Sequence, residues 1–183
     1  MTKNEIDLNS QLSTLVWLWK CRASKAANAH FYASDYYNTR HNVLTVFNVI
    51  SAISVLFFSN NSFFKGDLNL AVSIAGLATV LTTALQYVMS YGEVANSHRF
   101  VGNEYSNMKR KTERLIASGE LDLDTIHRLS HSLNAIGKSS PPVKRPLWKK
   151  SSDKFRSSID DLSSAEEDFL NTLSRNGIKF HAD

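Results

Sequence analysis

Two long runs without a charged residue, Asn42 to Phe64 and Leu68 to Gly92, constrain this chain more than any other feature. A bilayer core of about 30 Å needs roughly 20 apolar helical residues, and both runs reach that length. One central Lys or Asp would cost about 3 kcal/mol on insertion, so the absence of charge is informative. The alternative, two helices buried in a soluble core, needs more amphipathic material than 183 residues supply. We therefore predict a transmembrane helical hairpin.

The charges outside the two runs predict the orientation of this hairpin. The first run begins about forty residues into the chain after a polar N-terminus, which does not fit a cleavable signal peptide. Lys and Arg gather before the first run and after the second, whereas the connecting loop balances Lys65 with Asp67. Because positive charge marks the cytoplasmic side, both termini are predicted to be cytoplasmic.

Apolar and small residues keep a helical period on both sides of the predicted spans, which predicts that the helices extend into the cytoplasm. If the hairpin folds about Phe63 and Phe64, residue numbers at equal depth sum to about 127, which places His30 beside His98. Two histidines can bind a metal or sense pH, but no further His, Cys or carboxylate recurs nearby at ligand spacing. We predict a helix-packing seam and no metal site, with the seam formed by Trp19, His30, Tyr37, His98 and Tyr105.

Polar and small residues recur at steps of three and four within the second run, so they share one helical face. This polar stripe comprises Ser73, Gly76, Thr79, Thr83, Gln86 and Ser90, and Asn48 of the first run is the residue there most in need of a partner. Small residues and hydroxyls allow close helix packing, which is one interpretation. In the other, several copies turn the stripe inward to line an aqueous path. The two interpretations are compatible.

The chain changes character after Gly119, a predicted helix stop. Asp122 or Asp124 is a candidate N-cap for a short amphipathic helix that Gly137 would end. A break at 139–142 precedes a basic patch that comprises Lys138, Lys144, Arg145, Lys149, Lys150 and Lys154. We interpret this patch first as a surface for anionic lipid or solvent, then as a site for a protein partner, and last for a nucleotide or nucleic acid. A final amphipathic helix is predicted at about 153–175.

We therefore predict an all-α membrane protein with a two-transmembrane helical hairpin, long cytoplasmic helical extensions and a small C-terminal cytoplasmic helical region. Its predicted parts are a cytoplasmic N-terminal helix (1–42), transmembrane helix 1 (43–59), a short extracytoplasmic turn (60–67), transmembrane helix 2 (68–90), cytoplasmic helices (91–137), and a basic linker with a C-terminal amphipathic helix (138–183). No catalytic grouping rises above chance, so we predict no enzyme, no catalytic residue and no cofactor.

The layout also resembles a known family. A long helix with Trp17, Arg22 and His30 enters the first span, and the second span is followed by His98-Arg99-Phe100 and Tyr105. Together with the Ser140-Pro141-Pro142 break, this arrangement is similar to the SLATT domain over about residues 12 to 150. The resemblance implies a two-span effector of bacterial conflict systems that perforates the inner membrane when triggered. Such effectors are often paired with nucleotide-signal synthases or other sensor enzymes.

Two functional hypotheses follow. In the first, the chain is a pore-forming effector of antiviral defence in the bacterial inner membrane, which oligomerises, permeabilises the membrane and causes growth arrest or abortive infection. Its expected partners are membrane lipid, further copies of the chain, a sensor or signal-synthesising enzyme encoded nearby, and a cyclic nucleotide as ligand. In the second, the chain is a membrane-anchored scaffold whose basic C-terminal region recruits a protein or nucleic-acid partner. Direct nucleic-acid binding is the less favoured form of this hypothesis.

Overall fold

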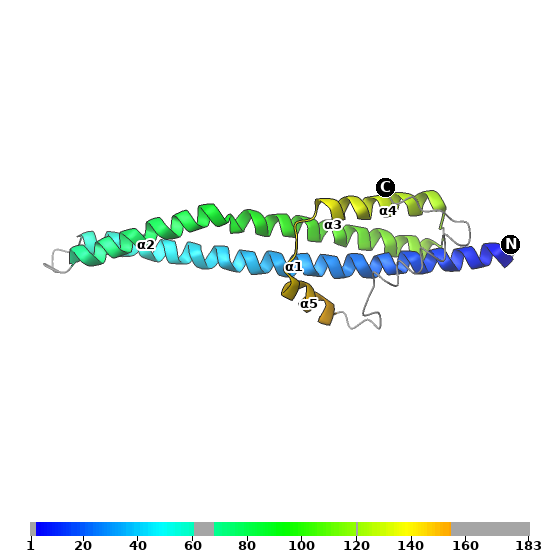
Figure 1. The fold of residues 1–183 in the computed structure, drawn as a ribbon, viewed down its shortest axis with the longest axis horizontal. Coiled ribbons are helices and arrows are strands. Elements are labelled where there is room, and N and C mark those ends of the chain that lie inside the picture. Colours follow the sequence, from blue (N-terminus) through cyan, green and yellow to red (C-terminus); the bar gives the residue numbers. More distant parts are fainter. Residues whose placement is uncertain (1–2, 61–67, 120, 155–183) are drawn as a thin grey trace. The chain divides into compact units, whose positions relative to one another are not determined.

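The structure, a computed structural model, describes residues 3–60, 68–119 and 121–154. Every regular element in these ranges is an α-helix, which confirms the predicted all-α class (Figure 1). The helices are α1 (Lys3–Asn60), α2 (Leu68–Met89), α3 (Tyr91–Ser118), α4 (Leu123–Ser139) and α5 (Arg145–Lys154).

The long helix α1 follows from what its sequence lacks. Its 58 residues contain neither Gly nor Pro, so no position loses the helical hydrogen bond or lowers the helix propensity sharply. The predicted N-terminal helix and the first uncharged run as far as Asn60 therefore form one continuous element.

A break at Ser90 separates α2 from α3. Ser90 has φ 42°, a left-handed conformation that costs a residue with a Cβ atom about 1–2 kcal/mol. Hydrogen bonds continue across the break, since the Ser90 amide donates to the Gln86 carbonyl at 3.1 Å and the Val94 amide to the Ser90 carbonyl at 3.0 Å. The hydrophobic pattern predicts an uninterrupted helix here, because it carries no signal for a single left-handed residue.

Two capping features fix the ends of α3 and α4. Gly119 has φ 68° directly after α3, which confirms it as the predicted helix stop. Asp122 is the N-cap of α4, and its Oδ1 accepts a hydrogen bond from the Thr125 amide at 2.6 Å. The prediction that Gly137 ends this helix is wrong, because α4 continues to Ser139 and stops only before Pro141.

The helix α5 lies inside the segment predicted as a basic linker. Pro146 is its second residue, where the missing amide hydrogen breaks no helical bond. The amides of Leu147 and Trp148 donate to the Lys144 carbonyl at 2.9 and 3.1 Å, which closes the first turn. The predicted final helix at about 153–175 lies almost entirely outside the described residues.

The chain divides into two compact units, unit 1 (Met1–Ala33 and His98–Asp183) and unit 2 (Ser34–Ser97). Unit 1 has a continuous apolar core where α1, α3 and α4 lie beside one another (Figure 1). This core includes Leu15, Trp19, Met108, Ile126 and Leu129, all less than 10% exposed. The helical period of each segment places these residues on its inward face.

Unit 2 shows the opposite distribution. Its buried residues, among those described, are Ser34, Ser51, Thr82 and Ala95, so no large apolar side chain is buried there. Large apolar residues lie outside instead, with Val43 62% exposed, Leu70 66% and Val88 75%. The two apolar stretches are long enough to cross a membrane, and only 6% of the most apolar window of each is buried. A core helix of a soluble protein would have most of such a window covered.

Candidate functional site

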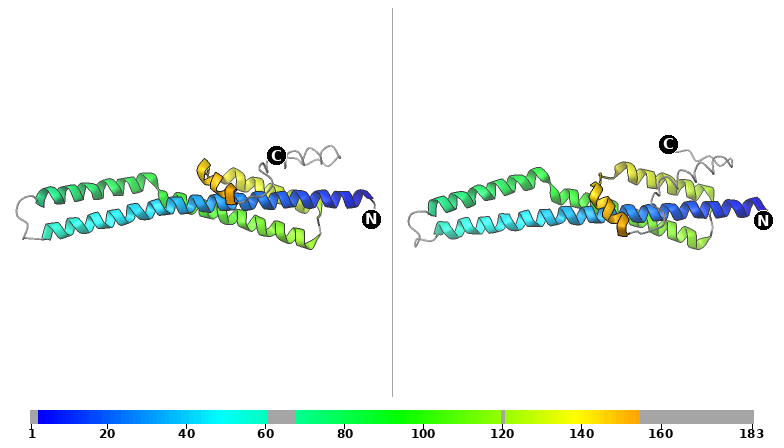
Figure 2. Two further views of the ribbon diagram at one scale, coloured as in Figure 1. Left: turned by 90° about the horizontal axis from the view of Figure 1, so that it is seen from below. Right: turned by 60° about the horizontal axis from the view of Figure 1, so that its bottom comes forward.

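The second half of α1 and α2 lie side by side in unit 2 (Figure 2). Hydrogen bonds between polar side chains join them. The Asn48 Nδ2 donates to Thr83 Oγ1 at 3.0 Å, and the Gln86 Nε2 donates to Thr45 Oγ1 at 2.8 Å. As the residue number rises on one helix it falls on the other, so the two segments are antiparallel. We call this set of contacts the polar seam.

The register of the polar seam differs from the predicted one by a helical turn. A turn centred on Phe63 and Phe64 places Asn48 level with Thr79, whereas Asn48 bonds to Thr83, four residues further along. The sequence of α2 defines the period of the stripe. It does not define which residue of α2 lies level with Asn48, because that depends on the tertiary structure.

Thr82 belongs to the seam although the sequence analysis did not select it. It is 8% exposed, its hydroxyl donates to the Ala78 carbonyl at 2.8 Å, and the same hydroxyl lies 3.4 Å from Asn48 Oδ1. A signal was available, because Thr82 stands three residues after Thr79 and thus on a neighbouring part of the same face.

Two threonine hydroxyls of the polar seam each donate one hydrogen bond to the backbone and accept another from a side-chain amide. Those of Thr45 and Thr83 donate to carbonyls four residues earlier, at 2.9 and 2.8 Å. Each hydroxyl oxygen keeps lone pairs with which it accepts a hydrogen bond from Gln86 or Asn48. Each amide therefore donates a hydrogen bond to an uncharged partner, which suits an apolar surrounding where an unpaired polar group is costly.

The remaining members of the predicted polar stripe have other surroundings. Thr79 donates to the Ala75 carbonyl at 2.9 Å, and Ser90 donates to the Tyr87 carbonyl at 3.1 Å. Ser73 is exposed, and a Cβ atom added at Gly76 would meet nothing within 4 Å. The stripe therefore divides into a bonded part near α1 and an open part around Gly76.

A histidine pair lies in the core of unit 1. The Nδ1 atoms of His30 and His98 are 3.0 Å apart, and the two residues are 3% and 1% exposed. Tyr105 stacks on His30 with ring centroids 5.8 Å apart. Burial, together with the charge that His98 would carry, lowers the pKa of His30 to about 4, and burial lowers the pKa of His98. Near neutral pH, one uncharged imidazole therefore donates to the other.

The other residues of the predicted helix-packing seam, which is distinct from the polar seam, lie in different units. Trp19 lies in the unit 1 core with Tyr105, whereas Tyr37 stacks on Tyr91 in unit 2 with centroids 6.0 Å apart. The described residues contain no group of three or more His, Cys, Asp or Glu able to hold a metal ion.

The predicted basic patch is distributed over more than one element. Lys138 is in α4, Lys144 precedes α5, and Arg145, Lys149 and Lys150 are exposed on α5. The side chain of Lys154 lies outside the described residues.

Three contacts hold α5 against α1. The Ser151 hydroxyl, fully buried, donates to the Lys25 carbonyl at 2.8 Å. Lys150 Nζ lies 4.9 Å from the Tyr32 ring centroid, and Lys25 Nζ lies 5.9 Å from the Trp148 ring centroid. Such cation–π contacts stabilise exposed sites by about 0.5–1 kcal/mol each. Sequence reasoning missed Ser151, because one serine among several carries no pattern.

Comparison with protein-family models, curated proteins and solved structures finds no match for this chain.

Proposed function

We propose that this chain is a two-span membrane protein of the bacterial inner membrane whose copies associate and permeabilise that membrane when triggered. The observation that carries this proposal is the inverted burial of unit 2, where the buried residues are small or polar and large apolar ones are exposed. Hydrocarbon is the surrounding that stabilises such a surface.

Both termini are proposed to be cytoplasmic, because Lys and Arg gather before the first run and after the second, whereas the connecting loop balances Lys65 with Asp67. Fusions at each terminus test this orientation. Green fluorescent protein should fluoresce at both ends, and alkaline phosphatase should be inactive at both. Active phosphatase at either end would contradict it.

The polar seam supports a permeation pathway. In a single copy Asn48 bonds to Thr82 and Thr83, and Gln86 bonds to Thr45 one turn away. These groups would equally bond to water. In this proposal the open part of the stripe, around Gly76, is where a second copy packs closely. Association of copies then decides whether the polar seam stays closed or lines a water-filled path.

The resemblance to the SLATT family supplies the biological setting. By that analogy the effector acts in antiviral defence, and its trigger is a nucleotide signal or a partner enzyme encoded nearby. Growth arrest or death of the infected cell is the proposed outcome.

Efflux from liposomes tests permeation. We expect the purified full-length chain to release a trapped dye, and the triple variant Thr79→Leu, Thr83→Leu and Gln86→Leu to release much less. The matched control is Leu77→Ile on the lipid-exposed side of α2, which should leave efflux unchanged. Equal efflux from all three proteins would remove the pore-lining assignment.

Gly76 tests the association of copies separately. Because a Cβ atom at Gly76 would meet nothing within 4 Å, Gly76→Leu should fold normally yet weaken crosslinking between copies in membranes. Ile74→Leu, at a position 60% exposed on the opposite side of α2, is the control and should crosslink as the unaltered chain does. Unchanged crosslinking of both variants would contradict close packing at this point.

The exposed cations of α5 favour a second candidate function, a membrane-anchored scaffold. Trp148 is 40% exposed beside Lys149 and Lys150, a combination that suits an anionic surface or partner. Under this alternative the hairpin can be exchanged for an unrelated two-span anchor without loss of cellular activity. Changing Lys144, Arg145, Lys149 and Lys150 to Gln would instead abolish activity.

A further inference from the structure

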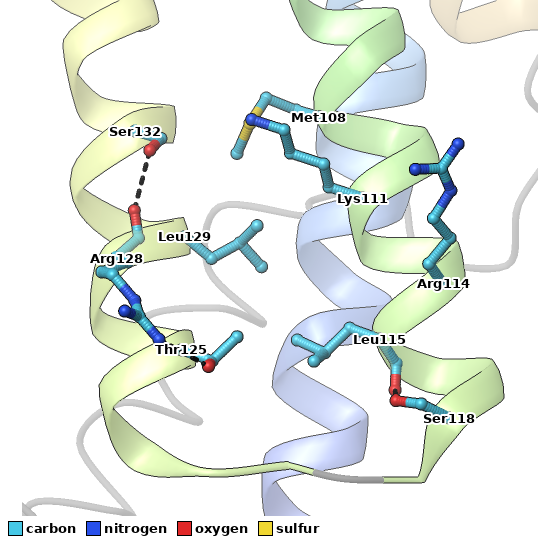
Figure 3. Close-up of a pocket in the computed structure, with 9 residues that line it drawn as sticks. All are labelled: Met108, Lys111, Arg114, Leu115, Ser118, Thr125, Arg128, Leu129 and Ser132. Atoms are coloured by element: carbon cyan, nitrogen blue, oxygen red, sulfur yellow. Dashed lines mark hydrogen bonds between the residues drawn. The ribbon is translucent and has the colours of Figure 1, made fainter.

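A cleft of about 430 Å³ lies between α3 and α4 within unit 1 (Figure 3). Leu115 of α3 and Leu129 of α4 point toward one another across it, and Met108 adds to the apolar lining. Its volume falls in the range that protein sites offer to ligands or to inserted side chains.

Three cations stand around this apolar lining. They are Lys111 and Arg114 of α3 and Arg128 of α4. Glu113, the carboxylate between the first two, is engaged elsewhere, at 3.4 Å from Lys20 Nζ and 3.9 Å from Lys109 Nζ.

Arg128 has a different local environment from the other two cations. Its Nη2 donates to Thr125 Oγ1 at 3.0 Å, and it helps to lower the pKa of Asp122, the N-cap of α4. Both oxygens of Asp122 already accept hydrogen bonds from Thr125 at 2.6 Å. The cleft therefore combines an apolar lining with a surplus of positive charge.

The chain supplies a segment of complementary chemistry beyond the described residues. Residues 155–183 carry six carboxylates against three Lys or Arg, whereas the chain as a whole has a net charge of +4. Large apolar residues are interspersed with these carboxylates, among them Phe155, Ile159, Leu162, Phe169 and Leu173.

We propose that residues 155–183, called here the acidic segment, dock in the cleft between α3 and α4 of the same chain. Its apolar residues contact Leu115 and Leu129, and its carboxylates pair with Lys111, Arg114 and Arg128. The proposal is independent of permeation, because it concerns contacts within unit 1 alone.

The attachment of α5 makes this docking geometrically easy. Ser151 is fixed to Lys25, five residues along α1 from Lys20, which pairs with Glu113 beside the cleft. Five helical residues correspond to about 7.5 Å of rise. As a coil, 29 residues would span about 30 Å, and the predicted helix at about 153–175 would be about 35 Å long. The acidic segment is long enough in either form. Covalent attachment raises its effective concentration at the cleft to the millimolar range.

Disulfide trapping in the full-length chain tests the proposal. In a Cys21→Ser background, Ser118→Cys is combined with Ser163→Cys, and the rate of intrachain disulfide formation is measured. The matched control replaces the neighbouring Ala117, which is exposed but does not line the cleft. We expect the Ser118 pair to form about fivefold faster than the Ala117 pair.

Charge reversal then tests the chemistry of docking. Lys111→Glu with Arg128→Glu should lower the Ser118 rate by about fivefold, and Asp160→Lys with Asp161→Lys should restore it. Equal rates at Ser118 and Ala117, or rates insensitive to both reversals, would overturn the proposal. Disulfides only between chains would also overturn it, since the acidic segment of another copy would then be the occupant.

Discussion

Acidification should destabilise this protein through His30. The perturbation is a fall in pH from 8 to 5, and the comparison is with His30→Asn, whose amide can still reach the Nδ1 of His98. In the folded chain the pKa of His30 is lowered from 6.5 to about 4, so the folded state takes up its proton later than the unfolded chain. Between these values the unfolded chain binds more protons, and stability therefore falls as pH falls.

The size of this effect follows from the two pKa values. The full difference between the unfolded and folded pKa of His30 corresponds to about 3 kcal/mol in the free energy of unfolding. This stability is lost progressively between pH 6.5 and pH 4. At pH 5 about 2 kcal/mol is already lost, and above pH 7 His30 contributes almost none of this dependence. For a chain of this size, 2 kcal/mol lowers the melting temperature by about 4–8 °C.

Thermal unfolding of the full-length protein in detergent micelles, followed by circular dichroism at pH 8 and pH 5, measures the effect. Between pH 8 and pH 5, the free energy of unfolding of the His30→Asn variant should fall by about 2 kcal/mol less than that of the unaltered chain. This holds even if the variant is less stable at pH 8. His131→Asn, at an exposed position of α4, is the control and should keep the full pH dependence. The reasoning is refuted if His30→Asn shows the same pH dependence as the unaltered chain.

Three further predictions concern packing. In lipid nanodiscs, Thr83→Val should destabilise the chain by about 1 kcal/mol more than Asn48→Leu, because it leaves the Asn48 amide without its acceptor, whereas the Thr83 hydroxyl keeps the Thr79 carbonyl. Equal losses in unfolding titrations would contradict this asymmetry. Gly102→Ala should cost about 1–2 kcal/mol in thermal melts, since its Cβ would lie 2.9 Å from the Phe31 ring. Gly137→Ala, where the Cβ would meet only ordinary contact, should instead stabilise by about 0.5–1 kcal/mol.

The all-helical class and the two membrane-length helices were predictable from the sequence. Uncharged runs and the absence of Gly and Pro from 58 consecutive residues act locally, so no knowledge of packing is needed to use them. The pairing of His30 with His98 also came from counting residues on either side of a short turn. Such counting succeeds within about one helical turn, as the shifted register at Asn48 shows.

Other features depended on contacts that a single segment cannot reveal. Ser90 adopts a left-handed conformation although it is not a glycine, so the residue type does not predict it. The helix α5 forms among basic residues with weak periodicity, and contacts with Lys25 and Tyr32 fix it against α1. The cleft between α3 and α4 needed the tertiary arrangement, because its cations come from two helices separated by a turn.

The core of unit 1 has a consequence for biosynthesis. His30 and His98 are 68 residues apart in sequence, and both uncharged runs lie between them. At 5–20 residues per second, the ribosome needs about 3–14 s to deliver the second histidine after the first. During that interval the inward face of the first helix has no partner. Prompt transfer of the intervening runs into lipid would shorten the exposure to aggregation and chaperones, so insertion and core assembly are expected to be coupled steps of maturation.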